Sequence, residues 1–258
     1  MQDLSGKTAW ITGAGSGIGE AVAIAYANAG MRLVLSGRRS SELERVAAAA
    51  RAAGAASAEQ VRVAPLDIAD ADAVEAVVAG IAAAEQRLDI LVNCAGINVP
   101  KRNWKHVTRQ GWDDVINIDL NGAFYACHAV LPLMRAQGDG LIINISSWAG
   151  RHVSALTGPA YSAAKFGMNA MTESLNVENG IHGIRATAVC PGEVSTPILD
   201  KRPIPVSAAD RARMVQAVDC GELMLFLARM PAHVCINDLT ISPTWNRGYV
   251  AQAQGIPD

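Results

Sequence analysis

The stretch Thr12-Gly13-Ala14-Gly15-Ser16-Gly17-Ile18-Gly19 decides the fold of this chain. It joins an apolar run typical of a buried β-strand, Lys7–Thr12, to a predicted helix, Gly17–Ala29. Four glycines in seven positions would be unfavourable inside a helix, where each costs about 1 kcal/mol relative to alanine. Glycine instead lets the chain turn sharply and lets a pyrophosphate approach the backbone. The stretch therefore predicts a phosphate-binding turn between a first strand and a first helix.

The start of the predicted helix adds to this interpretation. Its free N–H groups and partial positive charge attract an anion. A glycine pattern alone is weak evidence, but its place between a strand and a helix makes it stronger. The alternative is an ordinary glycine-rich turn. The residues expected to contact the ligand here are Gly13, Ser16, Gly17, Ile18 and Gly19.

The rest of the chain continues the alternation of strand and helix. Continuous apolar strands separated by helices indicate a parallel sheet covered on both faces. With right-handed crossovers this is a doubly wound α/β fold with three layers, α/β/α, which binds ligands beyond the carboxyl ends of its strands. Further strands are expected at Met31–Ser36, Val61–Leu66, Leu88–Asn93, Leu141–Ser146, Ile184–Cys190 and Val234–Ile241, and further helices at Ser40–Ala53, Asp70–Gln86, Gly111–Gln137, Pro159–Glu178 and Cys220–Arg229.

Length and composition limit the classes of protein. The 258 residues are enough for one large domain or two small ones at about 150 residues each, and without a linker we expect a single domain over residues 1–258. Half of the residues are hydrophobic and 18% are charged, which excludes disorder as the main state. The 22 basic and 24 acidic residues give a net charge of −2. No global field would therefore recruit nucleic acid or an anionic membrane.

The cysteines and the chain start indicate a reducing compartment. The five cysteines form no CxxC motif and no Cys/His cluster, so neither disulfides nor a metal site is expected. The segment Met1–Lys7 is polar and unlike a signal peptide. No run of about 18 apolar residues is free of charge or interruption. We expect a soluble, cytoplasmic protein.

The end of the second predicted strand bears on cofactor choice. Dinucleotide sites for NAD usually place an acid there for the ribose hydroxyls. Here the segment is Ser36-Gly37-Arg38-Arg39, without an acid. A guanidinium suits a 2′-phosphate, which a carboxylate would repel. The sequence therefore favours NADP(H) over NAD(H), with Arg38 and Arg39 as the selecting residues; the alternative is that both arginines are only solvated side chains at a helix start.

Candidate catalytic groups follow the fifth predicted strand. Tyr161 and Lys165 are one turn apart in Pro159–Glu178, so both side chains lie on one helix face. A phenol has an ordinary pKa near about 10, which a nearby ammonium and a cationic nicotinamide would lower. Tyr161 would then exchange a proton with an alcohol or carbonyl oxygen. Ser146-Ser147, at the strand end, brings a hydroxyl to the same place; the alternatives are a surface Tyr/Lys pair and serines that only satisfy backbone groups.

Together these motifs resemble the short-chain dehydrogenase/reductase family, over about residues 5–242. The resemblance implies a single-domain Rossmann fold. It also implies that Ser147, Tyr161 and Lys165 are the catalytic serine, tyrosine and lysine. Several motifs in the same chain order make the match specific.

The resemblance extends to cofactor contacts. Asp67, with Ile68 beside it, takes the position of the family's adenine contact. Asn93-Cys94-Ala95-Gly96 is similar to its Asn-Asn-Ala-Gly signature, with cysteine in the second place. Pro191-Gly192-Glu193-Val194-Ser195-Thr196 is similar to its Pro-Gly segment. The implied contacts are therefore Asp67, Ile68, Asn93, Ala95, Gly96, Tyr161, Lys165, Pro191, Gly192, Val194 and Thr196.

Two features depart from the family pattern. Asp119 takes the position of a catalytic asparagine in the helix after the fourth strand. It could hold a water for proton relay, or it could pair with Lys165 and raise its pKa. Tyr161 follows Ser147 by 14 residues, one more than is usual in the family. The extra residue is expected in the loop 148–158, and Ser146 is the alternative for the catalytic hydroxyl.

The implied activity is NADP(H)-dependent hydride transfer between a small-molecule ketone or aldehyde and its alcohol. The alternatives are a non-catalytic, cofactor-binding regulatory protein, and an epimerase or dehydratase with transient oxidation. Loops 97–110, 148–158 and 193–210 are expected to line the substrate pocket. Two of them are basic, which suggests either an anionic substrate or solvated charges. By resemblance, the long helices imply a homotetramer or a homodimer.

Overall fold

Parallel strands form the central layer of the computed structural model, which describes residues 1–54, 60–202 and 205–254. In this part of the chain one sheet has the strand order β3-β2-β1-β4-β5-β6-β9, and every pairing in it is parallel. The order reverses at β1, where a doubly wound sheet places its ligand. The strands are β1 Thr8–Thr12, β2 Arg32–Gly37, β3 Val61–Pro65, β4 Ile90–Asn93, β5 Gly140–Ile145, β6 Ile184–Pro191 and β9 Asp238–Ile241.

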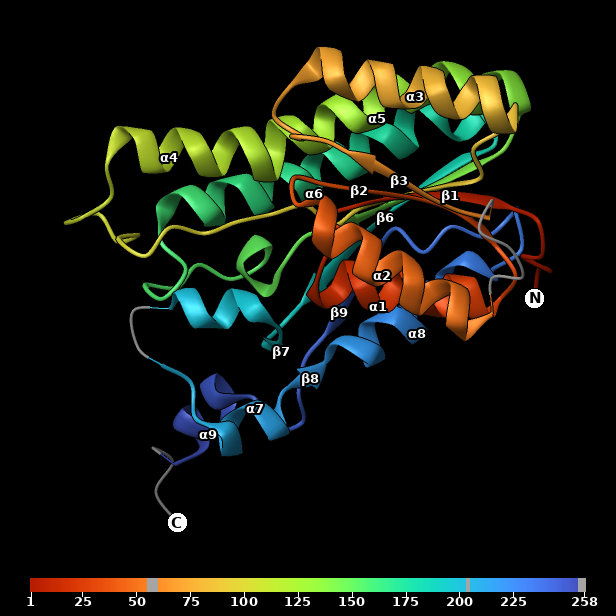
Figure 1. Cartoon of the computed structure of the whole chain (residues 1–258). Coiled ribbons are helices and arrows are strands. Elements are labelled where there is room, and N and C mark those ends of the chain that lie inside the picture. The colour runs from red at the N-terminus through yellow and green to blue at the C-terminus, as the bar shows by residue number, and fades with distance from the viewer. Residues whose placement is uncertain (55–59, 203–204, 255–258) are drawn as a thin grey trace.

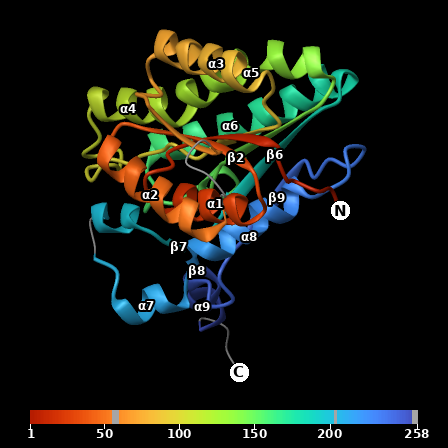
Figure 2. The same ribbon diagram turned by 45° about the vertical axis from the view of Figure 1, so that its right-hand side comes forward.

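Helices cover both faces of this sheet, as Figures 1 and 2 show. One face carries α1, α2 and α8, and the other carries α3, α4, α5 and α6. The predicted three-layer Rossmann fold is thereby confirmed. The helices are α1 Gly17–Asn28, α2 Ser40–Ala53, α3 Ala71–Glu85, α4 Arg109–Ile116, α5 Gly122–Gln137, α6 Pro159–Asn179 and α8 Ala217–Ala228.

The hydrophobic core is divided by the sheet into two halves. Side chains alternate along a strand, so Ala9 and Ile11 of β1 pack towards α1, α2 and α8. Trp10 points to the opposite half, where it packs with residues of α3 and α5. All five residues of β1 are buried. A strand that is apolar on both faces is what a sheet covered on both faces requires.

The expected helix Gly111–Gln137 is interrupted in the structure. Helix α4 begins earlier, at Arg109, because the Thr108 hydroxyl accepts a hydrogen bond from the Gly111 amide at 3.0 Å and caps it. A π-helical turn, Asn117–Asn121, then separates α4 from α5. Such turns occur mostly as single bulges inside α-helices and are frequent at functional sites. Asp119, fully buried, lies in this turn.

Several short elements, most of them after β6, were not predicted. Strands of two residues carry too little periodicity to be seen in a sequence. The last strand, expected from Val234, begins only at Asp238. Residues 203–204 of the expected pocket loop lie outside the described residues. The unpredicted elements are the strands β7 Val194–Ser195 and β8 Val215–Gln216, the helices α7 Ala208–Arg213 and α9 Arg247–Ala253, and the 3₁₀ turns Trp148–Gly150, Gly180–His182 and Pro197–Lys201.

Membrane-spanning helices and metal-ligating clusters are both absent from the described residues. None of the helices there combines the length and hydropathy that a bilayer crossing needs. No group of three or more His, Cys, Asp or Glu side chains there has the arrangement of a metal site.

Candidate active site

A cleft of about 800 Å³ runs along the carboxyl ends of the central strands. Its wall begins at the glycine turn after β1 and continues past the ends of β2, β3, β4, β5 and β6. This is where a doubly wound sheet binds its ligand. Most of the residues expected to contact a cofactor line it: Gly13, Ser16, Gly17, Ile18, Arg38, Arg39, Asp67, Ile68, Ala95, Gly96, Tyr161, Lys165, Pro191, Gly192, Val194 and Thr196.

The glycine turn has a geometry that side chains would not allow. Gly13 has φ +64, and a Cβ there would lie 2.7 Å from the Ala95 nitrogen and the Cys94 carbonyl oxygen. Gly17 has φ +59 and begins helix α1. The N-cap residue, Ser16, makes no side-chain capping hydrogen bond. The first amides of α1 therefore have no side-chain acceptor, as an anion site at a helix start requires.

Three of the expected site residues do not line the cleft: Gly19, Asn93 and Asp119. A Cβ on Gly19 would lie 2.4 Å from the Gly13 carbonyl oxygen, so this glycine lets α1 pack against the turn. The Asn93 amide donates to the Asn144 side chain at 2.9 Å and joins β4 to β5 inside the core. Gly19 and Asn93 thus support the walls of the cleft without lining it.

The cleft has a basic border at the end of β2. Arg38 and Arg39 are both exposed and line the cleft. Within the described residues neither guanidinium makes a hydrogen bond or an ion pair with another side chain. Asp67 is exposed on the same wall, and its carboxylate accepts a hydrogen bond from the Ala69 amide at 3.1 Å. Two cations and one anion therefore face this end of the cleft.

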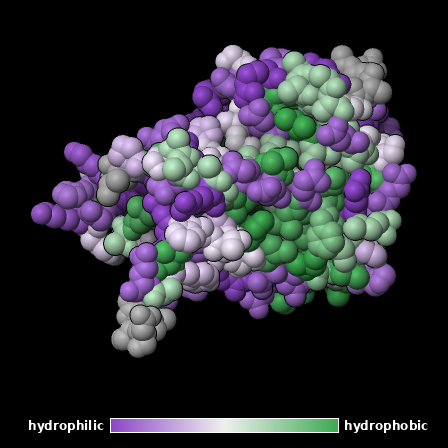
Figure 3. Space-filling model, turned by 90° about the horizontal axis from the view of Figure 1, so that it is seen from below, coloured by the Kyte–Doolittle hydropathy of each residue, from purple (hydrophilic) through white to green (hydrophobic). Residues whose placement is uncertain are grey.

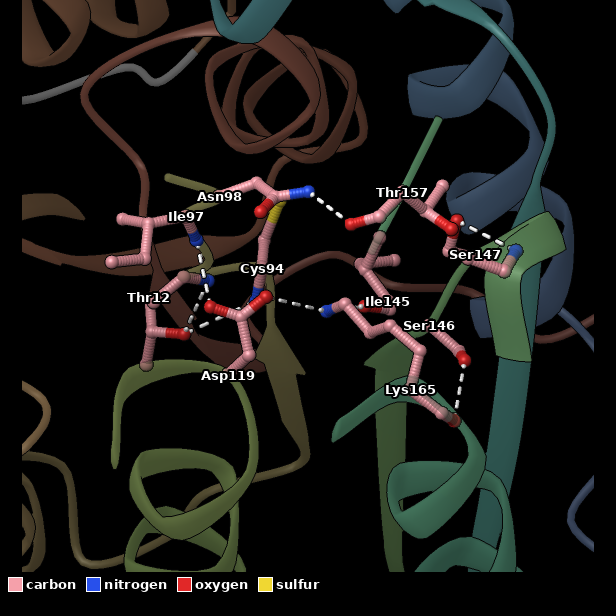
Figure 4. Close-up of polar contacts among 12 residues, drawn as sticks. Thr12, Cys94, Ile97, Asn98, Asp119, Ile145, Ser146, Ser147, Thr157 and Lys165 are labelled. Carbon is pink, nitrogen blue, oxygen red and sulfur yellow. Dashed lines mark hydrogen bonds and ion pairs between the residues drawn. The ribbon is translucent and has the colours of Figure 1, made fainter. Parts of the chain in front are cut away.

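Tyr161, Lys165 and Ser147 meet at the opposite end of the cleft. Helix α6 places Tyr161 and Lys165 one turn apart, with the Lys165 nitrogen 5.5 Å from the centre of the Tyr161 ring. The Lys165 ammonium donates to the Ile145 carbonyl at 3.0 Å (Figure 4). Ser147 follows the end of β5 and its hydroxyl accepts from the Ala149 amide at 3.1 Å. The fold therefore gathers the three expected catalytic side chains.

Asp119 lies behind Lys165, from the side of the π-helical turn. One carboxylate oxygen lies 3.6 Å from the Lys165 nitrogen, and the other accepts a hydrogen bond from the Ile97 amide at 2.7 Å (Figure 4). Complete burial raises the pKa of Asp119 to about 6, although the Lys165 charge and the Ile97 amide act to lower it. Of the two roles weighed for Asp119, the structure thus shows the pairing with Lys165.

The charges around Tyr161 set its proton affinity. Burial raises the pKa of Tyr161, and the Asp119 charge adds to this, while the Lys165 charge and a hydrogen bond with Ser147 act to lower it. For Lys165, burial lowers the pKa, but the charges of Asp119 and Tyr161 outweigh it, so the pKa is raised. Lys165 is therefore a permanent cation next to the phenol at neutral pH.

The two serines after β5 differ in their surroundings. The buried Ser146 hydroxyl donates to the Lys165 carbonyl at 3.1 Å, which holds β5 against α6. Ser147 lines the cleft with Tyr161, and its side chain acts to lower the Tyr161 pKa. This geometry favours Ser147 over Ser146 as the group that contacts substrate.

Thr12 and Asn98 are two of the polar cleft residues that were not predicted as site residues. The Thr12 hydroxyl accepts hydrogen bonds from the Cys94 amide at 3.1 Å and the Ala95 amide at 3.3 Å, which joins the ends of β1 and β4 (Figure 4). The Asn98 amide donates to the Thr157 carbonyl at 3.0 Å and so joins two of the pocket loops. A threonine that ends the first strand was the available signal for Thr12; nothing local distinguishes Asn98.

The basic residues of the pocket loops have different locations. Arg102 is buried and lines the cleft, and so does Arg202 from the third loop. Arg151 instead pairs with Asp238 outside the cleft. The remaining basic side chains of the first two loops do not line the cleft: Lys101, Lys105, His106, Arg109 and His152. Most of the predicted basic character of these loops is therefore solvated charge.

Comparison with known proteins agrees with the fold and the cleft. The family described as short chain dehydrogenase matches residues 7–204. An uncharacterized oxidoreductase of Staphylococcus aureus (strain USA300) is 32% identical over 243 residues, which cover 94% of this chain and 100% of that protein. The chain therefore belongs to the short-chain dehydrogenase/reductase family and is an oxidoreductase of that family.

Solved structures give the same placement. Levodione reductase superposes with a TM-score of 0.87 at 29% identity, covering 95% of this chain and 100% of that one. A metagenomic short-chain oxidoreductase in complex with NADP has a TM-score of 0.80 at 30% identity and covers 94% of this chain and 99% of its own. A serine dehydrogenase complexed with NADP⁺ has a TM-score of 0.82 at 27% identity and covers 92% and 95%.

Proposed function

We propose that this oxidoreductase transfers hydride reversibly between NADP(H) and a small-molecule ketone or aldehyde and its alcohol. The observation that carries the proposal is the continuity of one cleft. The glycine turn and Arg38 line one end, and Tyr161 and Ser147 line the other. A dinucleotide that spans the cleft would bring its nicotinamide to the phenol.

The residues present fit an NADP(H) molecule. The positive φ angles of Gly13 and Gly17 and the uncapped start of α1 suit a diphosphate. Arg38 and Arg39 are available for a 2′-phosphate, and no acid among the described residues stands directly at the end of β2. Two structural relatives, the metagenomic oxidoreductase and the serine dehydrogenase, were solved with NADP and NADP⁺. These observations support NADP(H) over NAD(H).

The chain's own groups would manage the proton and the geometry. When bound, NADP(H) supplies the hydride chemistry. In the reducing direction Ser147 donates a hydrogen bond that orients the substrate carbonyl, and Tyr161 donates a proton to its oxygen. Lys165 would hold the nicotinamide ribose, and its charge acts to lower the Tyr161 pKa. Asp119 keeps Lys165 charged and in place from behind.

The proposal is tested with a panel of ketones and alcohols, following the absorbance of the reduced nicotinamide with NADPH and with NADH. Tyr161→Phe is expected to lower turnover by a factor of about 10²–10⁴ while NADPH binding is retained, because only the proton donor is lost. Tyr125→Phe removes a hydroxyl outside the cleft and should leave turnover unchanged. A Tyr161→Phe protein with full turnover would contradict the proposal.

The same panel separates the competing activities. Net consumption of NADPH with a ketone argues against an epimerase or dehydratase, in which oxidation is only transient. NADPH binding without turnover of any panel member would favour a regulatory protein. We also propose that residues 1–258 form one cytoplasmic domain that binds a dinucleotide.

We further propose that the protein assembles as a homotetramer or homodimer. Helices α5 and α6 expose Phe124, Phe166 and Val177. The face over α1 and α8, seen from below in Figure 3, is also rich in hydrophobic residues, and α8 exposes Val218 and Phe226. Exposed apolar faces of this kind are typical of interfaces between subunits. Light scattering on the purified protein tests this; a monomeric mass at micromolar concentration would contradict it.

A further inference from the structure

The substrate end of the cleft carries two arginines that the catalytic mechanism does not use. Arg102, 9% exposed, comes from the loop after β4, and Arg202, with a side chain 15% exposed, comes from the segment after β7. Both line the same cleft as Tyr161 and Ser147. Charged side chains are rarely buried without an electrostatic reason.

The two guanidinium groups and the catalytic phenol are close enough to affect one another. Burial lowers the pKa of Arg102, the Arg202 charge lowers it further, and Tyr161 acts in the opposite direction. Two like charges therefore converge from different loops on the part of the cleft that holds the phenol. An anion placed between them would relieve their repulsion and offset the desolvation of Arg102.

The carboxylate next to Arg202 is shared with a second guanidinium group. Glu193 accepts a hydrogen bond from Arg202 at 2.7 Å and a second one from Arg247 at 2.8 Å. Burial acts to raise the pKa of Glu193, but the hydrogen bonds from Arg247 and Arg202 outweigh it, so the pKa is lowered and the group is ionised. One carboxylate is thus shared by two guanidinium groups. In the part of the chain that the structure describes, Asp67, at the Arg38 end, is the only acidic residue that lines the cleft.

The rest of this end is suited to a short carbon chain. Leu156 and Leu199 line the cleft beside Thr157 and Arg202 respectively. The Arg102 backbone packs closely against Gly158, since a Cβ on Gly158 would lie 2.1 Å from the Arg102 carbonyl oxygen. The pocket therefore offers apolar contacts to a chain beside two cationic groups.

We propose that the substrate carries an anionic oxygen group, a carboxylate or a phosphate, which Arg102 and Arg202 bind while its carbonyl faces Tyr161 and Ser147. This rests on the proposed function and names its substrate class. A guanidinium matches the two oxygens of such a group with parallel hydrogen bonds. The charge at one end then positions the carbonyl at the other.

The test is a set of substrates matched in shape and different in charge. The carboxylate arm pairs pyruvate with pyruvamide, acetoacetate with acetoacetamide, and levulinate with levulinamide; the phosphate arm pairs dihydroxyacetone phosphate with dihydroxyacetone. In at least one pair the anion should have a kcat/KM about tenfold or more above its neutral partner. Arg102→Gln and Arg202→Gln should each remove most of this preference, whereas Lys101→Gln, the exposed neighbour in the same loop, should keep it.

Two outcomes would overturn the proposal, and they are distinguishable from failure of the proposed function. Equal kcat/KM within every pair, or an anion preference unchanged in both arginine variants, removes the anionic substrate while the oxidoreductase function stands. If no panel member is turned over with NADPH or NADH, the proposed activity on these substrates fails. In that case, ligand-observed NMR with butyrate and butyramide tests the anion site without turnover. If the protein does not bind butyrate more tightly than butyramide, or if both arginine variants keep that preference, the anion site is overturned.

Discussion

Lys165 and Asp119 form a buried ion pair, with 3.6 Å between the ammonium nitrogen and a carboxylate oxygen. The pair sits directly behind the proposed catalytic end of the cleft, where Lys165 also donates to the Ile145 carbonyl. An asparagine at position 119 would keep an oxygen for the Ile97 amide but would remove the charge. The carboxylate therefore affects the proton affinities of Lys165 and Tyr161 rather than the local fold.

The first prediction concerns the pH dependence of activity in Asp119→Asn. The Asp119 charge raises the pKa of Tyr161, so its removal lowers that pKa. In the oxidising direction Tyr161 acts as a base, and the rise of kcat/KM with pH should move to lower pH. Asp113→Asn, an exposed control in α4, should leave the profile in place. Superimposable profiles for wild type and Asp119→Asn would show that the carboxylate has no influence on the phenol.

The second prediction concerns stability. Burial raises the pKa of Asp119 from 3.8 to about 6, so between these values the folded protein keeps a proton that the unfolded chain has lost. The free energy of unfolding of the wild type should therefore fall relative to that of Asp119→Asn as the pH rises from about 4 to 7, by on the order of 2–3 kcal/mol. Urea unfolding of both proteins across this range measures the difference, and a difference independent of pH would refute the assignment.

Much of the fold follows from local sequence. The apolar runs of β1 to β6 and the glycine turn are each contiguous in the sequence, so they can be recognised without tertiary information. The helix predicted over Ser40–Ala53 has those bounds in the structure. The π-helical turn around Asp119 could not be foreseen, because it depends on contacts with Ile97 and Lys165 that the fold creates. The same holds for β7 and β8, whose two-residue pairing is purely tertiary.

In the candidate site too, some residues could be predicted from local sequence and others could not. Tyr161 and Lys165 are close because they share a helix, so their spacing was enough to bring them together. Arg102 and Lys101 are neighbours in one loop, yet only Arg102 lines the cleft. Which of two adjacent cations points inwards depends on how loops from distant parts of the chain pack. Asn93 shows the converse, because a motif residue next to the cleft has its side chain bound to Asn144 in the core.

The third prediction concerns the choice of cofactor. Arg38→Ala and Arg39→Ala each remove a guanidinium that the structure leaves available at the end of β2. Loss of a charge-assisted contact to the 2′-phosphate should raise the KM for NADPH by about tenfold or more. NADH lacks that phosphate and is the internal control, so its KM should change little. An equal rise in the KM for both cofactors in each variant would show that neither arginine binds the 2′-phosphate.

The fourth prediction separates two glycines that lie in helices. Gly19→Ala would place a methyl group 2.4 Å from the Gly13 carbonyl oxygen, which is backbone and cannot move aside without displacing the turn. We expect it to destabilise the protein by about 1–3 kcal/mol and to weaken NADPH binding, because the turn and α1 would separate. Gly80, in α3, has nothing within 4 Å of its would-be Cβ, and Gly80→Ala should stabilise by about 0.5–1 kcal/mol. Denaturation curves and NADPH fluorescence titrations check both variants; a Gly19→Ala protein with wild-type stability and affinity would show that the turn tolerates a side chain there.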